Sequence, residues 1–184
     1  MKQLLITTHL YTFAVICVIA TTISSCTFKK KTDMETLTGT KENELTMLVG
    51  TYTSGDSKGI YSFRFNEETG TATALSETEV ENPSYLAVSA DGKFIYTVSE
   101  FNNEQAAANA FAFNQEKGTL KLLNSQKTGG EDPCYIITNG NNVITANYSG
   151  GSISVFPIAK DGSLLPASDI IKFEGSGTDK ERQE

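Results

Sequence analysis

Histidine, cysteine and arginine are scarce in this sequence of 184 residues. The one histidine, His9, lies near the start of the chain, and residues 26–184 contain none. Those residues therefore cannot form a Ser-His-Asp triad, a Cys-His pair or a histidine-ligated zinc site. Cys134 is the one cysteine beyond residue 26, so an intrachain disulfide framework is also excluded there.

Positive charge is scarce as well. Residues 26–184 contain 14 basic and 22 acidic residues, a net charge of −8. Their two arginines are Arg64 and Arg182. This balance argues against a nucleic-acid partner. The sequence also lacks a G-x-S-x-G elbow, a P-loop and calcium-loop spacing of acidic residues, so we expect no metal and no cofactor.

The first residues have the pattern of an export signal. An apolar stretch centred on residues 11–20 follows Lys2 and is too short to span a bilayer as a helix. The tetrapeptide ISSC that ends at Cys26 resembles a bacterial lipobox, in which the signal is cut before a cysteine that carries lipid. A plain signal peptide with a chance cysteine is the alternative.

We therefore predict a signal peptide over residues 1–25, a lipid anchor to the membrane through Cys26, and a flexible, charge-rich tether over residues 26–46. The predicted location is the cell envelope, periplasmic or outer membrane. If the segment is not a working signal, the location is the cytoplasm.

A repeat of 48 residues begins at Met47. The segments MLVGTYTSG, IYTVSEFNN and VITANYSGG start at Met47, Ile95 and Val143. Around them run short apolar-polar alternations bounded by Gly, Asn, Asp or Pro, which are typical of β-strands. Four strands in each unit of this length indicate an all-β fold, a β-propeller in which each unit is one four-stranded antiparallel blade.

The propeller is predicted to extend over residues 47–184. We expect a first blade without its innermost strand, complete blades over 82–128 and 129–173, and the start of another over 174–184. The expected strands of the two complete blades are 84–89, 94–99, 109–114, 119–126, 134–138, 143–147, 152–158 and 164–173. Because about three blades leave an open arc, and known propellers have about four to eight, we expect a truncated part of a longer propeller. A short protein that closes by self-association is the alternative.

Four segments carry a resemblance to a known family: LVGTYTSGDSKGIYSFRF, NPSYLAVSADGKFIYTVSE, ITANYSGGSISVFPI and FEGSGTDKERQE. In this order they resemble the lactonase family of seven-bladed β-propellers, whose best known activity is 6-phosphogluconolactonase and whose relatives include a muconate lactonizing enzyme. The resemblance implies lactone hydrolysis in carbohydrate metabolism, with 6-phosphogluconolactone as the first candidate substrate. In the family the last segment continues into a proline and two histidines that this sequence, ending at Glu184, does not reach; this leaves the activity of the chain open.

Strand order sorts the polar residues by face, because the connections after the second and fourth strands of a blade emerge on the same face. Lactone opening needs a base for water and donors for the oxyanion, and a phosphorylated substrate also needs cations. We assign Glu100 as the base or water-positioning residue and Arg182 as the anion clamp. The candidates for substrate binding on the same face are Gln183, Asn147, Tyr148 and Tyr52.

Other polar positions have plainer interpretations. Asn147 could instead cap a turn. Residues 90–92 and 139–141 lie on the opposite face and have the chemistry of hairpin turns. Cys134, on an innermost strand, is expected to be a small buried hydrophobe. A non-enzymatic cell-envelope propeller that binds a ligand or protein partner is the rival function, and a muconate-type lactonizing activity is a third.

Overall fold

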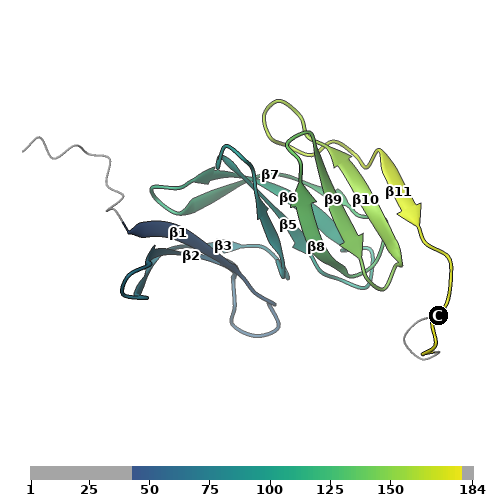
Figure 1. Ribbon diagram of the computed structural model, residues 1–184, viewed down its shortest axis with the longest axis horizontal. Helices are drawn as coiled ribbons and strands as arrows, with labels where there is room; N and C mark the ends of the chain where they lie inside the picture. Colours follow the sequence, from purple (N-terminus) through teal and green to yellow (C-terminus); the bar gives the residue numbers. More distant parts are fainter. Residues whose placement is uncertain (1–42, 180–184) are drawn as a thin grey trace, which may run out of the picture. The chain divides into compact units, whose positions relative to one another are not determined.

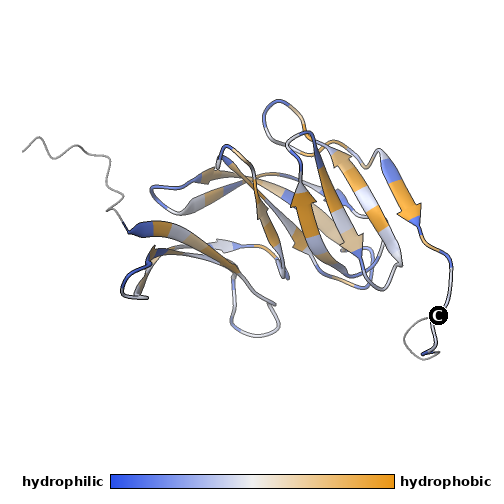
Figure 2. Cartoon of the chain, viewed as in Figure 1, coloured by the Kyte–Doolittle hydropathy of each residue, from blue (hydrophilic) through white to orange (hydrophobic). Residues whose placement is uncertain are grey.

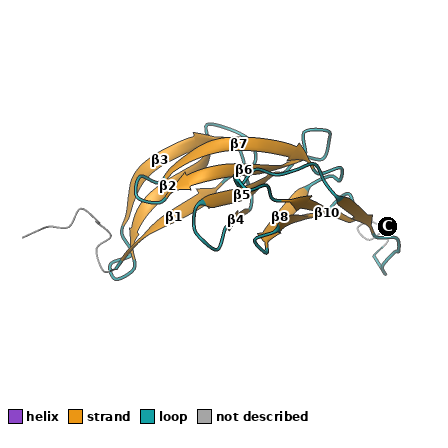
Figure 3. Cartoon of the chain, turned by 90° about the horizontal axis from the view of Figure 1, so that it is seen from above, coloured by secondary structure: helices purple, strands orange, loops and turns teal. Residues whose placement is uncertain are grey.

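The computed structural model describes residues 43–179. Every regular element in this range is a β-strand, and the strands form three antiparallel sheets of three, four and four strands (Figures 1 and 3). Within the same range no helix is long and apolar enough to cross a bilayer. The predicted all-β fold of small antiparallel sheets is confirmed.

Each sheet is a meander in which consecutive strands are neighbours. The first sheet contains β1 (Glu44–Gly50), β2 (Gly59–Asn66) and β3 (Ala72–Glu79). The second contains β4 (Leu86–Val88), β5 (Phe94–Ser99), β6 (Ala107–Asn114) and β7 (Thr119–Lys127). The third contains β8 (Pro133–Thr138), β9 (Asn142–Asn147), β10 (Ser152–Pro157) and β11 (Asp169–Lys172). Strands β4 and β11 are shorter than the predicted ranges 84–89 and 164–173.

Strand β1 begins inside the segment predicted to be a tether. Leu45 pairs with Phe65 and Thr46 with Arg64 in the β1–β2 register, and the Arg64 guanidinium donates to Thr46 Oγ1 at 3.0 Å. The predicted end of the tether at residue 46 was therefore wrong. Polar composition suggested a solvated linker, but cross-strand pairing with β2 orders these residues.

The 48-residue repeat is visible in irregular details as well as in strands. The ladder from β2 to β3 shifts register between Ser62 and Phe63, and the ladder from β6 to β7 shifts between Ala110 and Phe111, 48 residues later. A β-bulge bends and twists its strand locally. The equivalent bulges therefore give the first two sheets the same local bend.

The hairpin turns predicted on the face opposite the candidate residues are confirmed. Between β4 and β5, Gly92 has a φ of 68° and its N–H donates to the Ser89 carbonyl at 2.9 Å. The Asp91 carboxylate accepts from the Ser89 hydroxyl at 2.7 Å, and this hydrogen bond lowers the pKa of Asp91. The same carboxylate accepts from the Lys93 N–H at 3.1 Å. Side-chain to backbone bonds of this second kind are what favour Asp and Ser in turns.

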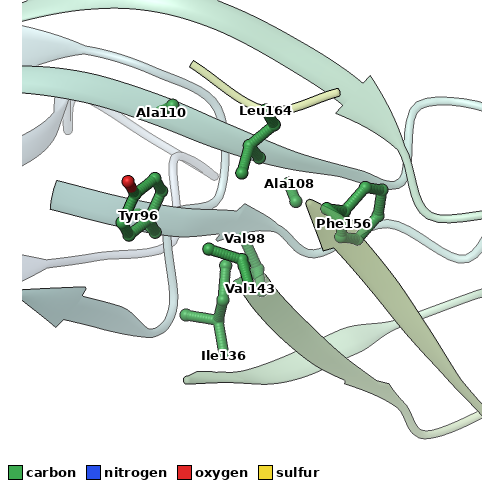
Figure 4. Packing of buried hydrophobic residues seen from close by; sticks show 8 residues of the cluster. All are labelled: Tyr96, Val98, Ala108, Ala110, Ile136, Val143, Phe156 and Leu164. Carbon is green, nitrogen blue, oxygen red and sulfur yellow. The ribbon is translucent and has the colours of Figure 1, made fainter. Parts of the chain in front are cut away.

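The largest hydrophobic core lies between the second and third sheets. Figure 4 shows side chains of β5 and β6 meeting side chains of the third sheet, among them Phe156, and Leu164 of the β10–β11 connection. A smaller cluster of Ile60, Ile95 and Phe111 joins the first and second sheets. Hydrophobic residues are concentrated on the strands (Figure 2), and full burial of each large apolar side chain contributes about 1.5–3 kcal/mol to folding.

Candidate functional site

The connections β1–β2, β3–β4, β5–β6, β7–β8 and β9–β10 emerge at the same end of the sheets, which we call the rim. Two non-glycine residues with positive φ shape it: Asn82 at 45° and Asp132 at 50°. Each is followed by a proline: Pro83 lies three residues before β4, and Pro133 is the first residue of β8. Asparagine and aspartate tolerate this left-handed conformation better than most residues do.

These two residues tie the rim loops to one another. The Asn82 carbonyl accepts from the Glu100 N–H at 3.0 Å, and the Asp132 carbonyl accepts from the Tyr148 N–H at 2.9 Å. The Asn82 side chain also accepts from the Thr53 N–H at 3.0 Å and thereby holds the β1–β2 loop. The Asp132 N–H donates to the Phe101 carbonyl at 2.8 Å, so hydrogen bonds to the Asn82 and Asp132 backbones hold the chain on both sides of Glu100.

The fixed backbone brings three polar side chains of two sheets together. The Ser84 hydroxyl donates to Glu100 Oε2. Tyr52, from the loop after β1, lies beside the same carboxylate: desolvation raises the pKa of the Tyr52 hydroxyl, and its hydrogen bonding to Glu100 and the negative charge there raise it further. The Ser84 side chain lowers it, and Cys134 of the third sheet lies near enough to add a small rise. We call Tyr52, Ser84 and Glu100 the rim cluster.

The rim cluster has a clear chemical capability. Its carboxylate is partly exposed and can accept a proton from water, while the neighbouring phenol, 57 % exposed, stays protonated and can donate to an oxygen of a ligand. Among residues 43–179 no group of three His, Cys, Asp or Glu side chains could hold a metal ion. The expected absence of a metal and of a cofactor stays a prediction.

The sequence analysis placed Tyr52 and Glu100 on one face, and the structure brings them together. Tyr148 also lies on the rim and is 67 % exposed, but its side chain makes no hydrogen bond to any residue of the described range. Arg182, Gln183 and Cys26 lie outside the described residues, so their assignments stay predictions.

Asn147 does not occupy the position assigned to it. Its side chain is 2 % exposed; its amide donates to Ser152 Oγ at 3.0 Å and Ser154 Oγ at 2.8 Å, and its carbonyl accepts from Thr145 Oγ1 at 3.0 Å. Both amide hydrogens are used inside the sheet, so a substrate-binding role would require breaking these bonds. The assignment of Asn147 to a substrate site is corrected to a buried structural role, in which its amide bonds Ser152 across the β9–β10 turn.

Cys134 is the second correction, because it is exposed and not buried. The β8–β9 register shifts between Pro133 and Tyr135, at Cys134 itself, and β8 is an edge strand of its sheet. Ser84 and Cys134 were missed as site neighbours. The signal that could have found them is their shared repeat position, directly after Asn82-Pro83 and Asp132-Pro133.

The electrostatics of the rim cluster can be tested by titration. The variant Glu100→Gln is expected to lower the pKa of Tyr52 toward its ordinary value of 10.0, because removing a negative charge stabilises the tyrosinate. Tyrosine-labelled NMR followed through alkaline pH would measure this shift. Tyr61 serves as the internal reference, and an unchanged Tyr52 titration in the variant would show that the two groups do not interact.

Comparison with known proteins agrees with the fold. Residues 46–184 match the sequence family described as "Lactonase, 7-bladed beta-propeller". The 6-phosphogluconolactonase of Bacillus subtilis (strain 168) is 37 % identical over 142 residues, which are 74 % of this chain and 39 % of the relative. The chain thus spans about two fifths of the length of that relative.

Two solved structures extend the comparison. A crystal structure from Bacteroides fragilis NCTC 9343, described as a candidate 6-phosphogluconolactonase, is 71 % identical with a TM-score of 0.77, over 78 % of this chain and 40 % of that one. The periplasmic gluconolactonase of Pseudomonas aeruginosa is 31 % identical with a TM-score of 0.64, over 70 % of this chain and 38 % of that one.

Proposed function

This chain belongs to the lactonase family of seven-bladed β-propellers, and on this premise we propose that the protein hydrolyses a sugar lactone at the rim cluster. The observation that carries the proposal is that Tyr52 and Ser84, from the loops of two sheets, both meet the Glu100 carboxylate. A fold alone implies no activity, so the argument depends on this constellation and on the relatives that carry the activity in their names.

The proposed reaction adds water to the lactone carbonyl carbon. Glu100 takes one proton of the attacking water, and the Tyr52 hydroxyl donates to the developing oxyanion. The ring C–O bond then breaks, and the proton held by Glu100 passes to the departing ring oxygen. The product is the open hydroxy acid, which loses its acidic proton to solvent. Ser84 keeps the carboxylate oriented through its hydrogen bond.

The first candidate substrate is 6-phosphogluconolactone, which the Bacillus subtilis relative has in its name. A phosphate needs a cation, and the one arginine within residues 43–179, Arg64, donates to Thr46 and to the Glu116 carbonyl, away from the rim cluster. Arg182, with Gln183 beside it, is therefore proposed to bind the phosphate. The second candidate is an unphosphorylated gluconolactone, favoured by the predicted export signal and by the periplasmic relative.

An assay with both lactones tests the proposal. The full-length gene product should release acid from at least one lactone faster than buffer does, measured with a pH indicator in weakly buffered solution. If the site requires the phosphate, the native protein should hydrolyse 6-phosphogluconolactone much faster than gluconolactone. The variant Arg182→Ala should lose this preference. Acid release at the buffer rate from both lactones would overturn the proposed function and favour the non-enzymatic binding protein.

The proposal also includes export and lipid anchoring through Cys26. Removal of the predicted signal before this cysteine would leave a lipidated N-terminus and the charged stretch of residues 27–43 ahead of the first strand. In cells fed a radiolabelled fatty acid, the full-length gene product should carry the label and sediment with membranes, whereas Cys26→Ser should lose both properties. An unlabelled product that keeps Met1 and stays in the cytoplasm would contradict the anchor.

A further inference from the structure

Two tyrosines from neighbouring sheets form an exposed aromatic pair. Tyr85 lies one residue before β4 and Tyr135 lies in β8, and these two edge strands contact each other. The ring centroids are 4.7 Å apart and the ring planes are tilted by 51°. Tyr85 is 42 % exposed and Tyr135 is 41 % exposed, so the two rings present a joint aromatic surface to solvent. We call Tyr85 and Tyr135 the tyrosine pair.

A bulge before each tyrosine interrupts the regular alternation of the strand. The Val98 N–H donates to the Tyr85 carbonyl at 3.2 Å, and the Glu100 N–H donates to the Asn82 carbonyl at 3.0 Å. The segment before β4 therefore holds one residue more than its partner, as in a β-bulge. The β8–β9 ladder shifts register at the equivalent place, directly before Tyr135. At both places successive side chains need not point to opposite faces.

The tyrosine pair lies beside the rim cluster. Tyr85 directly follows Ser84 of that cluster, and Tyr135 directly follows Cys134, which lies near enough to Tyr52 to add to the rise of its pKa. Cys134 and Tyr135 are both exposed, as the bulge allows. Because consecutive Cα atoms are about 3.8 Å apart, both rings start within one residue of groups at the candidate site.

This placement is chemically suited to a sugar ring. Single exposed aromatic residues are common, but ligand sites combine aromatic surface with a few polar groups, as the tyrosine pair and the Glu100 carboxylate do here. The face of an aromatic ring carries partial negative charge. It therefore attracts the C–H groups of a sugar ring and repels carboxylates. Neither hydroxyl of the pair makes a hydrogen bond within residues 43–179, so the rings can be covered without breaking one.

We infer that the tyrosine pair binds the ring of the lactone and holds its carbonyl carbon beside Glu100. This inference rests on the proposed function and specifies the substrate class: cyclic lactones with a face of C–H groups, in preference to acyclic dicarboxylates such as muconate. Tyr85 and Tyr135 are positioning and specificity residues, and the proton transfers stay with the rim cluster.

Binding of D-gluconolactam tests the inference independently of hydrolysis, because an amide in the ring resists the reaction. We expect saturable shifts of the Tyr85 and Tyr135 ring signals in NMR of the full-length gene product with labelled tyrosine. The ring of Tyr61, on β2, serves as the reference and should not shift. Muconate at the same concentrations should leave the pair unchanged. Lack of a saturable shift at both rings with the lactam would overturn the inference.

Kinetics of leucine and phenylalanine variants test the same surface. Tyr85→Leu and Tyr135→Leu should each raise KM about fivefold or more, because they remove aromatic surface. They should leave kcat within about twofold, since this contact is the same in the ground state and the transition state. Tyr85→Phe and Tyr135→Phe keep the ring and should restore KM. Leu122→Ala, which removes exposed apolar surface from the outer strand β7, is the control and should keep the native KM.

Failure of this inference and failure of the proposed function give different results. Lactone hydrolysis with native KM in both leucine variants would overturn the tyrosine pair as a binding surface and leave the proposed function standing. Saturable lactam binding at both rings, without hydrolysis of either lactone, would do the reverse. Equal saturable shifts with muconate would overturn the preference for ring compounds.

Discussion

Replacing Glu100 with glutamine should lower the rate constant of lactone hydrolysis, kcat, by about 10²–10⁴-fold. The substitution preserves the shape of the side chain and can keep the contact with Ser84, but it removes the group proposed to take a proton from water. Because ground-state binding does not depend on that proton transfer, KM should change little. Initial rates of the full-length gene product with the better lactone measure both constants.

A matched control exists a few residues along the chain. Glu104 lies in the same β5–β6 connection, is exposed, and its carboxylate makes no hydrogen bond or ion pair with another described residue. Glu104→Gln makes the same change of charge and should leave kcat within about twofold of native, since surface substitutions of this kind have small effects. Native kcat in Glu100→Gln would rule out Glu100 as the base and move the reaction away from the rim cluster.

Replacing Phe156 with alanine should lower the free energy of unfolding by about 3–5 kcal/mol. Phe156 is fully buried and belongs to the core that joins the second and third sheets (Figure 4). Its removal leaves a cavity that neighbours such as Val98 and Val143, held in their own strands, cannot fill. Urea unfolding of the full-length gene product, followed by circular dichroism, measures the loss.

Phe173→Ala is the control for that experiment. Phe173 follows β11 and is 64 % exposed, so the same loss of a ring should cost about 0.5 kcal/mol or less. Equal destabilisation by the two substitutions would mean that the core between these sheets does not control unfolding. A loss of stability confined to Phe156→Ala would support a core between these sheets that controls unfolding.

The arrangement of strands could be predicted from the sequence because it depends on local patterns. Alternating β-branched and aromatic residues specify strands, and turn residues such as Asp91-Gly92 specify their ends. The repeat of 48 residues then placed equivalent strand ends, and with them Tyr52 and Glu100, on one rim. Strand β1 shows the limit of this prediction: Glu44 and Thr46 at its start are polar, and only their pairing with β2 identifies them as part of a strand.

Burial of the polar residues was harder to predict, because it depends on the neighbouring sheet. Asn147 and Ser99 are equivalent in the repeat, yet one is fully hydrogen-bonded and the other faces a cavity. Cys134 was expected inside the protein and is exposed, whereas its repeat equivalent Ser84 donates to Glu100. The repeat spacing alone assigns Asn147 and Ser99 to one position of the blade, and Cys134 and Ser84 to another, so it cannot predict that their surroundings differ.

The sequence by itself therefore determined the repeat, the strands and the face on which the candidate residues lie, since period-two patterns and turn chemistry act within a few residues. Only the tertiary structure decided which of these residues meet and which are closed off. Ser84 joins Glu100 through a contact between two loops, and Gly130 packs so closely on Asn147 that an added Cβ would lie 2.5 Å from Asn147 Nδ2. Such contacts depend on the approach of separate sheets, which no local pattern encodes.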